Sequence, residues 1–275
     1  MEYPKCNLHT HTRYCDGADT PEELVREAIG LGMTVLGFSG HSHTPFDPGY
    51  CMSLEGTVAY REEILRLKQV YADDIRILCG IEQDYYSPQP EQHFDYRIGS
   101  VHYLLREGEY LPVDMSPEAL RGQVERYFEN DIYRYIRCYY ETVADVVSKT
   151  KCEIVGHFDL VEKFNRGGVL FDAEDFRYRR PMLDALDALL ARDVVFEINT
   201  GAIARGRRNV PYPMVYILRR IAERGGRVMI NSDTHKKEHL MCAYETAAQL
   251  ARSCGVGGFV VPTEHGWVTK PLRFR

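Results

Sequence analysis

The stretch HTHTRYCDG, residues His9 to Gly17, decides how the rest of this chain is interpreted. It holds two histidines at positions i and i+2 and a carboxylate, Asp16, shortly after them. The run Cys6-Asn7-Leu8 precedes it and predicts the end of a first strand. Side chains at i and i+2 of a strand lie on one face, so His9 and His11 should point to the same place. Two such imidazoles form half of a divalent metal site, although two surface histidines in a polar turn would look the same.

Composition restricts the class of protein. The chain has 275 residues, of which 44% are hydrophobic, enough for a large core in one domain. A formal net charge of −6 argues against general affinity for nucleic acid. No apolar run approaches the length that crosses a bilayer, and the N-terminus lacks the apolar segment of a secretory signal. Eight cysteines without a CxxC pair are typical of reduced thiols, so we expect a cytoplasmic protein. From its charge and the length of its apolar runs, we expect it to bind neither nucleic acid nor membrane.

Short apolar runs alternate with helical segments along the chain. Strands are expected at residues 6–8, 35–38, 75–81, 97–101, 153–156, 194–198 and 227–230, and a final strand at 258–261. Helices are expected at about 20–31, 54–71, 116–149, 173–192, 213–224 and 240–254. This order predicts an α/β fold in which a parallel sheet closes, or nearly closes, into a barrel. A doubly wound open sheet is the alternative, but no glycine-rich phosphate loop follows the first strand. We expect one domain over residues 1–275, with a helical insertion at about 116–150.

Six of the seven strands predicted for the barrel end at a histidine or a carboxylate. In a parallel barrel the carboxyl ends of the strands share one face, where active sites are built. The residues concerned are His9, His11, His41, Glu82, His102, His157, Asp233 and His235. Together with Asp16 they make nine potential ligands, which suit two or three metal ions with a carboxylate able to bridge a pair. Mixed imidazole and carboxylate ligands favour zinc, iron, manganese or cobalt over magnesium or calcium.

The remaining candidates near these strand ends are weaker. Cys15 adjoins Asp16, but thiolate ligands usually occur in sets, so we interpret it as a bystander. His43, His93, His239 and His265 fit the pattern less well and are interpreted as surface or supporting groups.

Six motifs, HTHTRYCDG, SGHS, GIEQDY, GSVHYL, GHFDL and NSDTH, occur in this order from His9 to His235. The ordered set resembles the polymerase and histidinol phosphatase (PHP) superfamily, most closely its monofunctional histidinol-phosphate phosphatases. This resemblance implies a distorted (β/α)7 TIM-like barrel with three divalent transition-metal ions at the carboxyl-terminal mouth of the strands. One departure is Gly40, where relatives commonly have an acidic residue before the histidine. An aspartate at position 16, where many relatives have histidine, resembles the histidinol phosphatase branch.

The resemblance also implies which residues hold each ion. The first ion would take His9, His11, Glu82 and Asp233. The second would share Glu82 and add His102 and His157. The third would take Asp16, His41 and His235. A metal-bound hydroxide held by Glu82, Asp233 and His235 would then attack phosphorus in line.

The implied activity is hydrolysis of L-histidinol phosphate to L-histidinol and phosphate in histidine biosynthesis. Three divalent ions would outweigh the three carboxylates and make the mouth locally positive, which attracts a small phosphomonoester. Arg205, in NTGAIARGRRNVPYP, is the first candidate for binding phosphate, followed by Lys163 and Arg166 after His157. Each could equally be a solvated surface charge. Asp84, Tyr85 and Tyr103 are candidates for recognising the organic part of the substrate.

Three alternatives remain open at this point. The same chemistry would suit another small phosphomonoester, a phosphotyrosine or a nucleotide. An amidohydrolase-like barrel acting on C–N bonds also starts with His-x-His, but Glu82 on the third strand and the additional His41 fit it poorly. A non-catalytic or polymerase-associated module would be expected to have lost some of the nine ligands.

Overall fold

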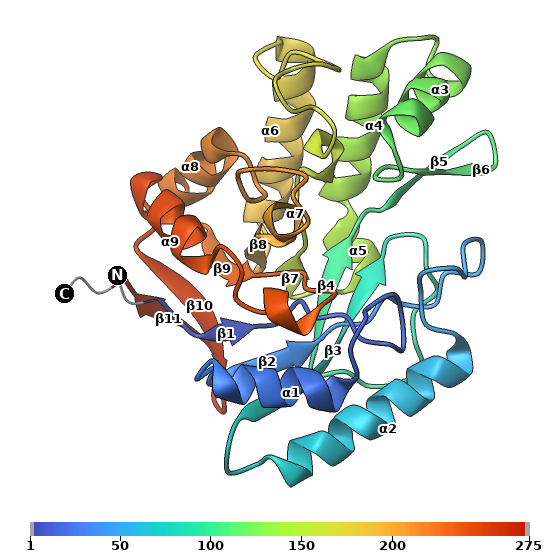
Figure 1. Cartoon of the computed structure of the whole chain (residues 1–275). Coiled ribbons are helices and arrows are strands. Elements are labelled where there is room, and N and C mark those ends of the chain that lie inside the picture. The colour runs from blue at the N-terminus through green and yellow to red at the C-terminus, as the bar shows by residue number, and fades with distance from the viewer. Residues whose placement is uncertain (1–2, 273–275) are drawn as a thin grey trace.

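Seven parallel strands form a nearly closed barrel (Figure 1), as the alternation of strands and helices predicts. The computed structural model describes residues 3–272. Around the barrel the strands follow the order β1 (Cys6–Asn7), β2 (Val35–Phe38), β3 (Arg76–Asp84), β4 (Tyr96–Ser100), β7 (Ile154–Val155), β8 (Val195–Asn199) and β9 (Arg227–Asn231). All seven lie within a residue or two of the predicted runs except β3, which continues through Glu82 to Asp84.

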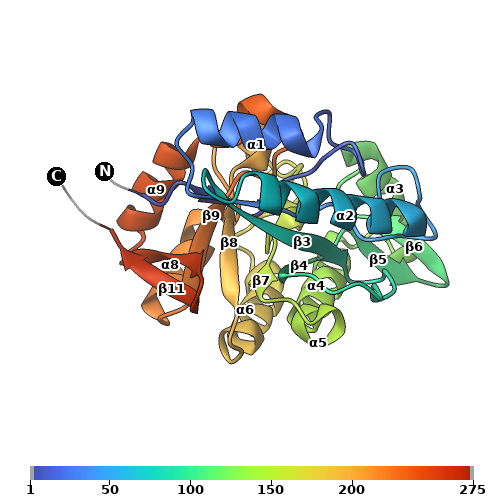
Figure 2. The ribbon, with the colours of Figure 1, turned by 90° about the horizontal axis from the view of Figure 1, so that it is seen from below.

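Helices connect the strands and cover much of the outside of the barrel. They are α1 (Pro21–Gly30), α2 (Leu54–Val70), α3 (Pro117–Tyr127), α4 (Ile132–Ala144), α5 (Val146–Thr150), α6 (Phe176–Leu190), α7 (Gly201–Ala204), α8 (Val215–Glu223) and α9 (Tyr244–Ser253). Figure 2 shows α1 and α2 on one side of the strands and α4, α6 and α8 on the other. The segment predicted at 116–149 forms three helices, separated first where Glu129 and Asn130 adopt positive φ. No helix in the described part of the chain is long and apolar enough to cross a membrane.

Two antiparallel hairpins were not predicted. The first joins β5 (Tyr103–Arg106) to β6 (Glu109–Pro112) through Glu107-Gly108, and both turn residues have positive φ. Such a two-residue turn matches the twist of the strands that it connects. The second joins β10 (Gly258–Thr263) to β11 (Gly266–Pro271), where the sequence analysis expected one strand. The excursion between β4 and β7 therefore begins directly after His102, before the predicted helical insertion.

The seam between β1 and β9 is closed mainly by side chains. Asn7 Oδ1 accepts a hydrogen bond from the Ser232 amide at 3.0 Å, and Asn231 Oδ1 accepts one from the Leu8 amide at 2.9 Å. Beyond them a single parallel bridge joins Thr10 to Thr234. The two asparagines replace a regular ladder of backbone hydrogen bonds, which satisfies buried amide groups that would otherwise be costly. This seam brings the two ends of the sequence together.

The barrel interior changes from apolar to polar along the strands. Its amino-terminal half is filled by Leu8, Leu78, Ile98, Met229 and their neighbours, all of them buried. Tyr96 lies at the boundary, fully buried, and its hydroxyl lies within hydrogen-bond distance of the carbonyl oxygens of Leu8 and Phe38. Because successive strand residues face opposite sides, Leu78, Gly80 and Glu82 share the inner face of β3. The same strand thus supplies both core and site.

We predict that Gly80→Ala destabilises the barrel. A Cβ atom at Gly80 would lie 2.2 Å from Cζ of the buried Tyr96 ring, so the ring would have to move. Overpacking of this kind costs about 1–3 kcal/mol of the free energy of unfolding. Denaturant unfolding followed by circular dichroism measures the effect. Gly122→Ala in α3 is the matched control, because nothing lies within 4 Å of its Cβ position. Equal stability of the two variants would contradict this account of the interior.

Candidate metal centre

All nine predicted ligands lie together at the carboxyl end of the strands. They come from the segment after β1, from β3, and from the residues that follow β2, β4, β7 and β9. Glu82 is 1% exposed, and His9 and His11 are fully buried. Asp16 and His235 are the most accessible members. Buried imidazoles and carboxylates in one group are rarely tolerated unless they pair with one another or bind metal.

The first cluster surrounds Glu82 Oε2 and Asp233 Oδ1. Nε2 of His9 lies 3.2 Å from the glutamate oxygen and 3.6 Å from the aspartate oxygen. Nε2 of His11 lies 3.5 Å and 3.3 Å from the same two atoms. Donor atoms of His9, His11, Glu82 and Asp233 therefore lie close together, and these are the four residues that the family resemblance implies for the first ion.

The second cluster uses the other oxygen of the same glutamate. Glu82 Oε1 lies 3.1 Å from Nε2 of His157 and 3.5 Å from Nε2 of His102. The Ser100 hydroxyl donates to this oxygen at 2.6 Å and fixes the orientation of the carboxylate. One carboxylate thus presents its two oxygens to two different sets of imidazoles. This is the arrangement of a bridging ligand.

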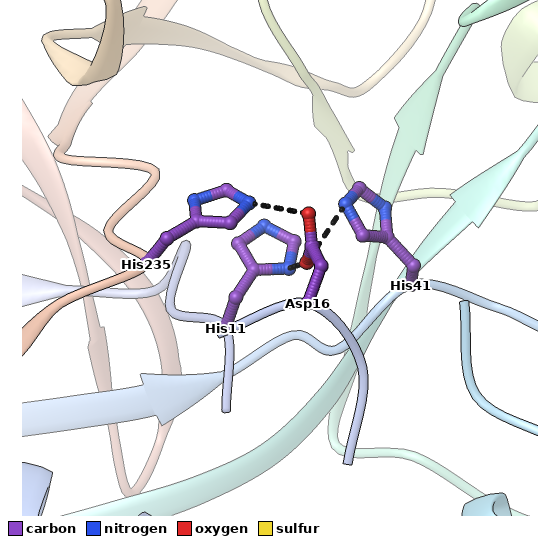
Figure 3. Close-up of side chains that lie close together, drawn as sticks. All are labelled: His11, Asp16, His41 and His235. Atoms are coloured by element: carbon purple, nitrogen blue, oxygen red, sulfur yellow. Dashed lines mark hydrogen bonds and ion pairs between the residues drawn. The ribbon is translucent and has the colours of Figure 1, made fainter. Parts of the chain in front are cut away.

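The third cluster is centred on Asp16 (Figure 3). Its carboxylate lies between His235 and His41, at 3.1 Å from Nε2 of the first and 3.6 Å from Nε2 of the second. Nδ1 of His11 lies 3.7 Å from the same carboxylate. The other ring nitrogen of His41 lies 2.9 Å from Glu82 Oε2, so this ring connects the third cluster to the first. Each residue of this third cluster, together with His11, offers one ligand atom, and these four atoms all lie within 4.8 Å of one another. The four residues are His11, Asp16, His41 and His235.

Several of these donor atoms are buried and lack a hydrogen-bond partner among the residues that the structure describes. Nε2 of His9, Nε2 of His11 and Oε2 of Glu82 are buried, and no hydrogen-bond partner for them exists among residues 3–272. Buried polar atoms without partners are rare in native proteins and point to an ion or water. Burial, together with His235 and His41, lowers the pKa of His11 to about 3, which keeps its ring neutral as metal binding requires. The donor set supports divalent-metal binding.

Comparison with known proteins agrees with this geometry. The family model described as PHP domain matches residues 7–201. This chain belongs to the PHP domain family. A protein of Deinococcus radiodurans named probable histidinol-phosphatase is 30% identical, over 94% of this chain and 96% of its own length. One of Schizosaccharomyces pombe with the same name is 26% identical, over 95% and 92%.

A solved structure shares the fold of this PHP-domain chain. It is the histidinol phosphate phosphatase of Lactococcus lactis, crystallised with zinc, L-histidinol and phosphate. It superimposes with a TM-score of 0.73 at 22% identity, over 94% of this chain and 97% of its own. The likeness confirms the barrel predicted from the sequence.

Two buried carboxylates behind the ligands were missed as positioning groups. Glu197, on β8, is fully buried, and its Oε1 lies 2.7 Å from Nδ1 of His9. Its Oε2 accepts a hydrogen bond from the His157 amide at 3.0 Å. Asp84 Oδ2 lies 3.2 Å from Nδ1 of His102 and also accepts from the His102 amide. Such contacts fix the ring orientation and tautomer of a metal-binding histidine. A glutamate within the apolar run VVFEI is the signal that could have revealed Glu197.

The substrate side of the site is a cavity of about 370 Å³. Arg205 and Lys163 both line it, as expected for phosphate-binding groups. Arg205 Nη2 lies 2.9 Å from Asp233 Oδ2, and its Nη1 donates to the Asp233 carbonyl at 3.1 Å. The backbone of Gly201 packs directly against the Asp233 side chain, since a Cβ atom at Gly201 would lie only 2.9 Å from it.

Three candidates for substrate contact lie elsewhere. Arg166 lines a separate cavity with Glu162 and Arg208. The structure therefore gives no support to the prediction that Arg166 binds phosphate. Asp84 lies behind His102, and the Tyr85 hydroxyl donates to Asp145 at the outside of the barrel. Tyr103 does line the cavity.

Cys15 and His43, two of the weaker candidates near the strand ends, lie close to the site without joining the three clusters. Cys15 Sγ lies 3.5 Å from Nδ1 of His11, and burial raises the pKa of this thiol to about 12, so the thiol stays protonated. His43 lies outside the cavity, with Nδ1 3.1 Å from the Met52 carbonyl oxygen.

We predict that metal affinity rises with pH. Burial opposes protonation of His102, but Glu82 and Asp84 raise its pKa to about 9. In the metal-free protein this ring therefore holds a proton at neutral pH, and a metal ion must displace it. Affinity should increase about tenfold per pH unit for each displaced proton between pH 6 and 8, and level off above pH 9. Zn²⁺ titration calorimetry in buffers of different ionisation enthalpy counts the protons. An affinity independent of pH in this range would contradict the assignment of His102 as a ligand.

We predict that Glu197→Gln weakens metal binding. The amide keeps the shape of the carboxylate but loses the charge that faces His9, so the variant should lose about 10- to 100-fold in metal affinity. Chelator competition followed by elemental analysis measures the loss. Glu153→Gln is the matched control: Glu153 accepts a backbone hydrogen bond from Arg97 at the opposite end of the barrel. Equal metal affinity in the two variants would show that Glu197 has a purely structural role.

Proposed function

We propose that this PHP-domain protein is a metal-dependent phosphatase that hydrolyses L-histidinol phosphate to L-histidinol and phosphate, a reaction of histidine biosynthesis. The observation that carries the proposal is the convergence of nine ligand candidates at the carboxyl end of the strands. Six of them line one cavity, with Arg205 and Lys163 also in its wall. Two relatives that match nearly all of the chain are named as probable histidinol-phosphatases, which supports the same activity here.

The three clusters would hold three divalent ions, of zinc, iron, manganese or cobalt. His9, His11, Glu82 and Asp233 would hold the first; Glu82, His102 and His157 the second; Asp16, His41 and His235 the third. When bound, the ions supply Lewis acidity toward phosphoryl oxygens and activate water for attack on phosphorus. Elemental analysis of gently purified protein should find two to three transition-metal ions per chain.

The residues of the chain itself orient the phosphate. Burial opposes the charge of Arg205, but Asp233 raises its pKa, so the guanidinium stays protonated. Its two terminal nitrogens are already fixed by the Asp233 side chain and carbonyl, which limits the guanidinium to one plane at the cavity wall. A planar, fixed donor pair suits phosphoryl oxygens. Because Asp233 is also in the first cluster, the phosphate site and the metal site share one anchor.

The cavity also favours a small substrate. Tyr50, Tyr103 and Tyr212 contribute aromatic walls, and Leu160 and Met115 contribute apolar ones. Side chains of this kind exclude water from a phosphoryl group and contact the organic part of a small ester. A volume of about 370 Å³ fits a compact monoester rather than a folded protein or a nucleic acid.

A turnover screen tests the function. Protein reconstituted with Mn²⁺ or Zn²⁺ is assayed with L-histidinol phosphate, phosphotyrosine, a nucleoside monophosphate and a phosphodiester. L-histidinol phosphate should give the highest kcat/KM. Faster hydrolysis of another monoester would reassign the substrate, and faster hydrolysis of the diester would overturn the phosphatase proposal.

We predict that Arg205→Ala weakens phosphate recognition. The variant should lower kcat/KM for monoesters by about 10- to 100-fold, mainly through KM, because it removes charge-assisted hydrogen bonds to the terminal phosphoryl oxygens. A diester presents fewer such oxygens, so its hydrolysis should fall less. Arg207→Ala, at an exposed neighbouring arginine, is the control. An unchanged ratio of monoester to diester hydrolysis would remove Arg205 from the phosphate site.

A further inference from the structure

One ion pair in the cavity wall has no part in the metal centre. Lys163 Nζ lies 2.8 Å from Asp114 Oδ2. Lys163 follows the turn after β7, whereas Asp114 follows β6 and so belongs to the excursion between β4 and β7. Both side chains line the same cavity as His102, His157 and Arg205. The pair therefore lies where a substrate must enter.

Asp114 differs from the other carboxylates of this cavity. Asp16 and Asp233 belong to the metal clusters. Asp47 accepts a hydrogen bond from the Tyr103 hydroxyl at 2.7 Å. Asp114 alone among these four pairs with a lysine. Burial opposes its ionisation, but Lys163, followed by His102, holds the pKa of this carboxyl below its ordinary value, so it is charged at neutral pH. Arg205, the first candidate for binding phosphate, lines the same cavity as Asp114.

We propose that Asp114 and Lys163 exchange partners when substrate binds. The Asp114 carboxylate accepts the ammonium group of the substrate, and the Lys163 ammonium turns to the phosphoryl oxygens. The site then selects phosphomonoesters that carry a primary ammonium within a few bonds of the ester oxygen, which are phosphorylated amino alcohols. This inference rests on the proposed function and identifies the residues that recognise the ammonium group of the substrate.

The exchange discriminates because of what happens without an amine. The Asp114 side chain is 33% exposed, so it is half-buried in the wall of the cavity. A phosphate that draws Lys163 away leaves this carboxylate charged and unpaired beside the bound ester, and a charge that loses its partner there is costly. A substrate that brings its own ammonium avoids this cost. Lysine has a flexible four-carbon stem and can turn between the two anions, whereas the short aspartate side chain stays in place. Specificity then comes from a penalty on the wrong substrate as much as from attraction to the right one.

A variant-by-substrate cycle tests the exchange. L-histidinol phosphate and its deamino analogue, in which hydrogen replaces the ammonium group, are assayed with the metal-reconstituted unmodified protein and with Asp114→Asn. The unmodified protein should prefer the amino substrate by at least about 30-fold in kcat/KM, and Asp114→Asn should reduce that preference at least about tenfold. Asp47→Asn makes the same charge change in the same cavity and should leave the preference unchanged.

Lys163→Met provides a second variant with a contrasting expectation. It removes the ammonium that turns to the phosphoryl oxygens, so both substrates should be hydrolysed more slowly. Asp114 can still accept the substrate ammonium, so the preference for the amino substrate should persist, whereas Asp114→Asn reduces it. If the pair were merely structural, Asp114→Asn and Lys163→Met would leave the preference equally unchanged, and the inference would be overturned.

The outcomes separate this inference from the proposed function. Equal hydrolysis of the two substrates by the unmodified protein overturns the amine-reading role and leaves the phosphatase in place. Failure to hydrolyse either substrate overturns the proposed function, and the inference with it. Circular dichroism of each variant shows whether a changed preference comes from a folded protein.

Discussion

The seam between β1 and β9 is the constraint on which the site depends. At the Thr10–Thr234 bridge, the His11 amide donates to the Thr234 carbonyl at 2.8 Å and the Thr234 amide donates to the His9 carbonyl at 3.1 Å. These two bonds join segments from opposite ends of the sequence. His9 and His11 flank Thr10, and Asp233 and His235 flank Thr234. Closing the barrel therefore brings together three of the four residues of the first cluster. Any movement at this seam would separate His9 and His11 from Asp233.

The polar half of the barrel interior is stable only as a network. Burial acts to raise the pKa of Glu82 and of Glu197, but the facing imidazoles hold the pKa of each below its ordinary value. His9 lies between these two glutamates, with one ring nitrogen toward each. Removing one member leaves a buried charge without a partner, which costs more than the pair contributes. The apolar half of the interior, filled around Tyr96, carries the stability that this arrangement lacks.

The sequence predicts the barrel and its ligands for a physical reason. Strands buried on both faces read as apolar runs, and parallel crossovers put all their carboxyl ends on one face. Histidines at those ends must then converge, whatever their separation in sequence. The positioning roles of Glu197 and Asp84 were not predicted because they depend on which histidine ring nitrogen each carboxylate faces. Sequence spacing does not determine this. Arg166 lines a separate cavity although Lys163, three residues earlier, lines the site cavity, and chain position alone does not distinguish the two. The β5–β6 hairpin was overlooked because Glu-Gly is a less common signal for a tight turn than Asn-Gly or Asp-Gly.

The division of labour between barrel and excursion explains how the site is organised. The nine ligand candidates come from barrel strands or the segments that directly follow them, and these segments are held in register by the sheet. Tyr103, Asp114 and Met115, which line the cavity above the ligands, come instead from the excursion between β4 and β7. A change in that excursion would alter the cavity wall without disturbing the sheet that positions the ligand candidates. The ligand candidates and this part of the cavity wall therefore come from different layers of the fold, and the two layers meet where Lys163, following β7, pairs with Asp114 from the excursion.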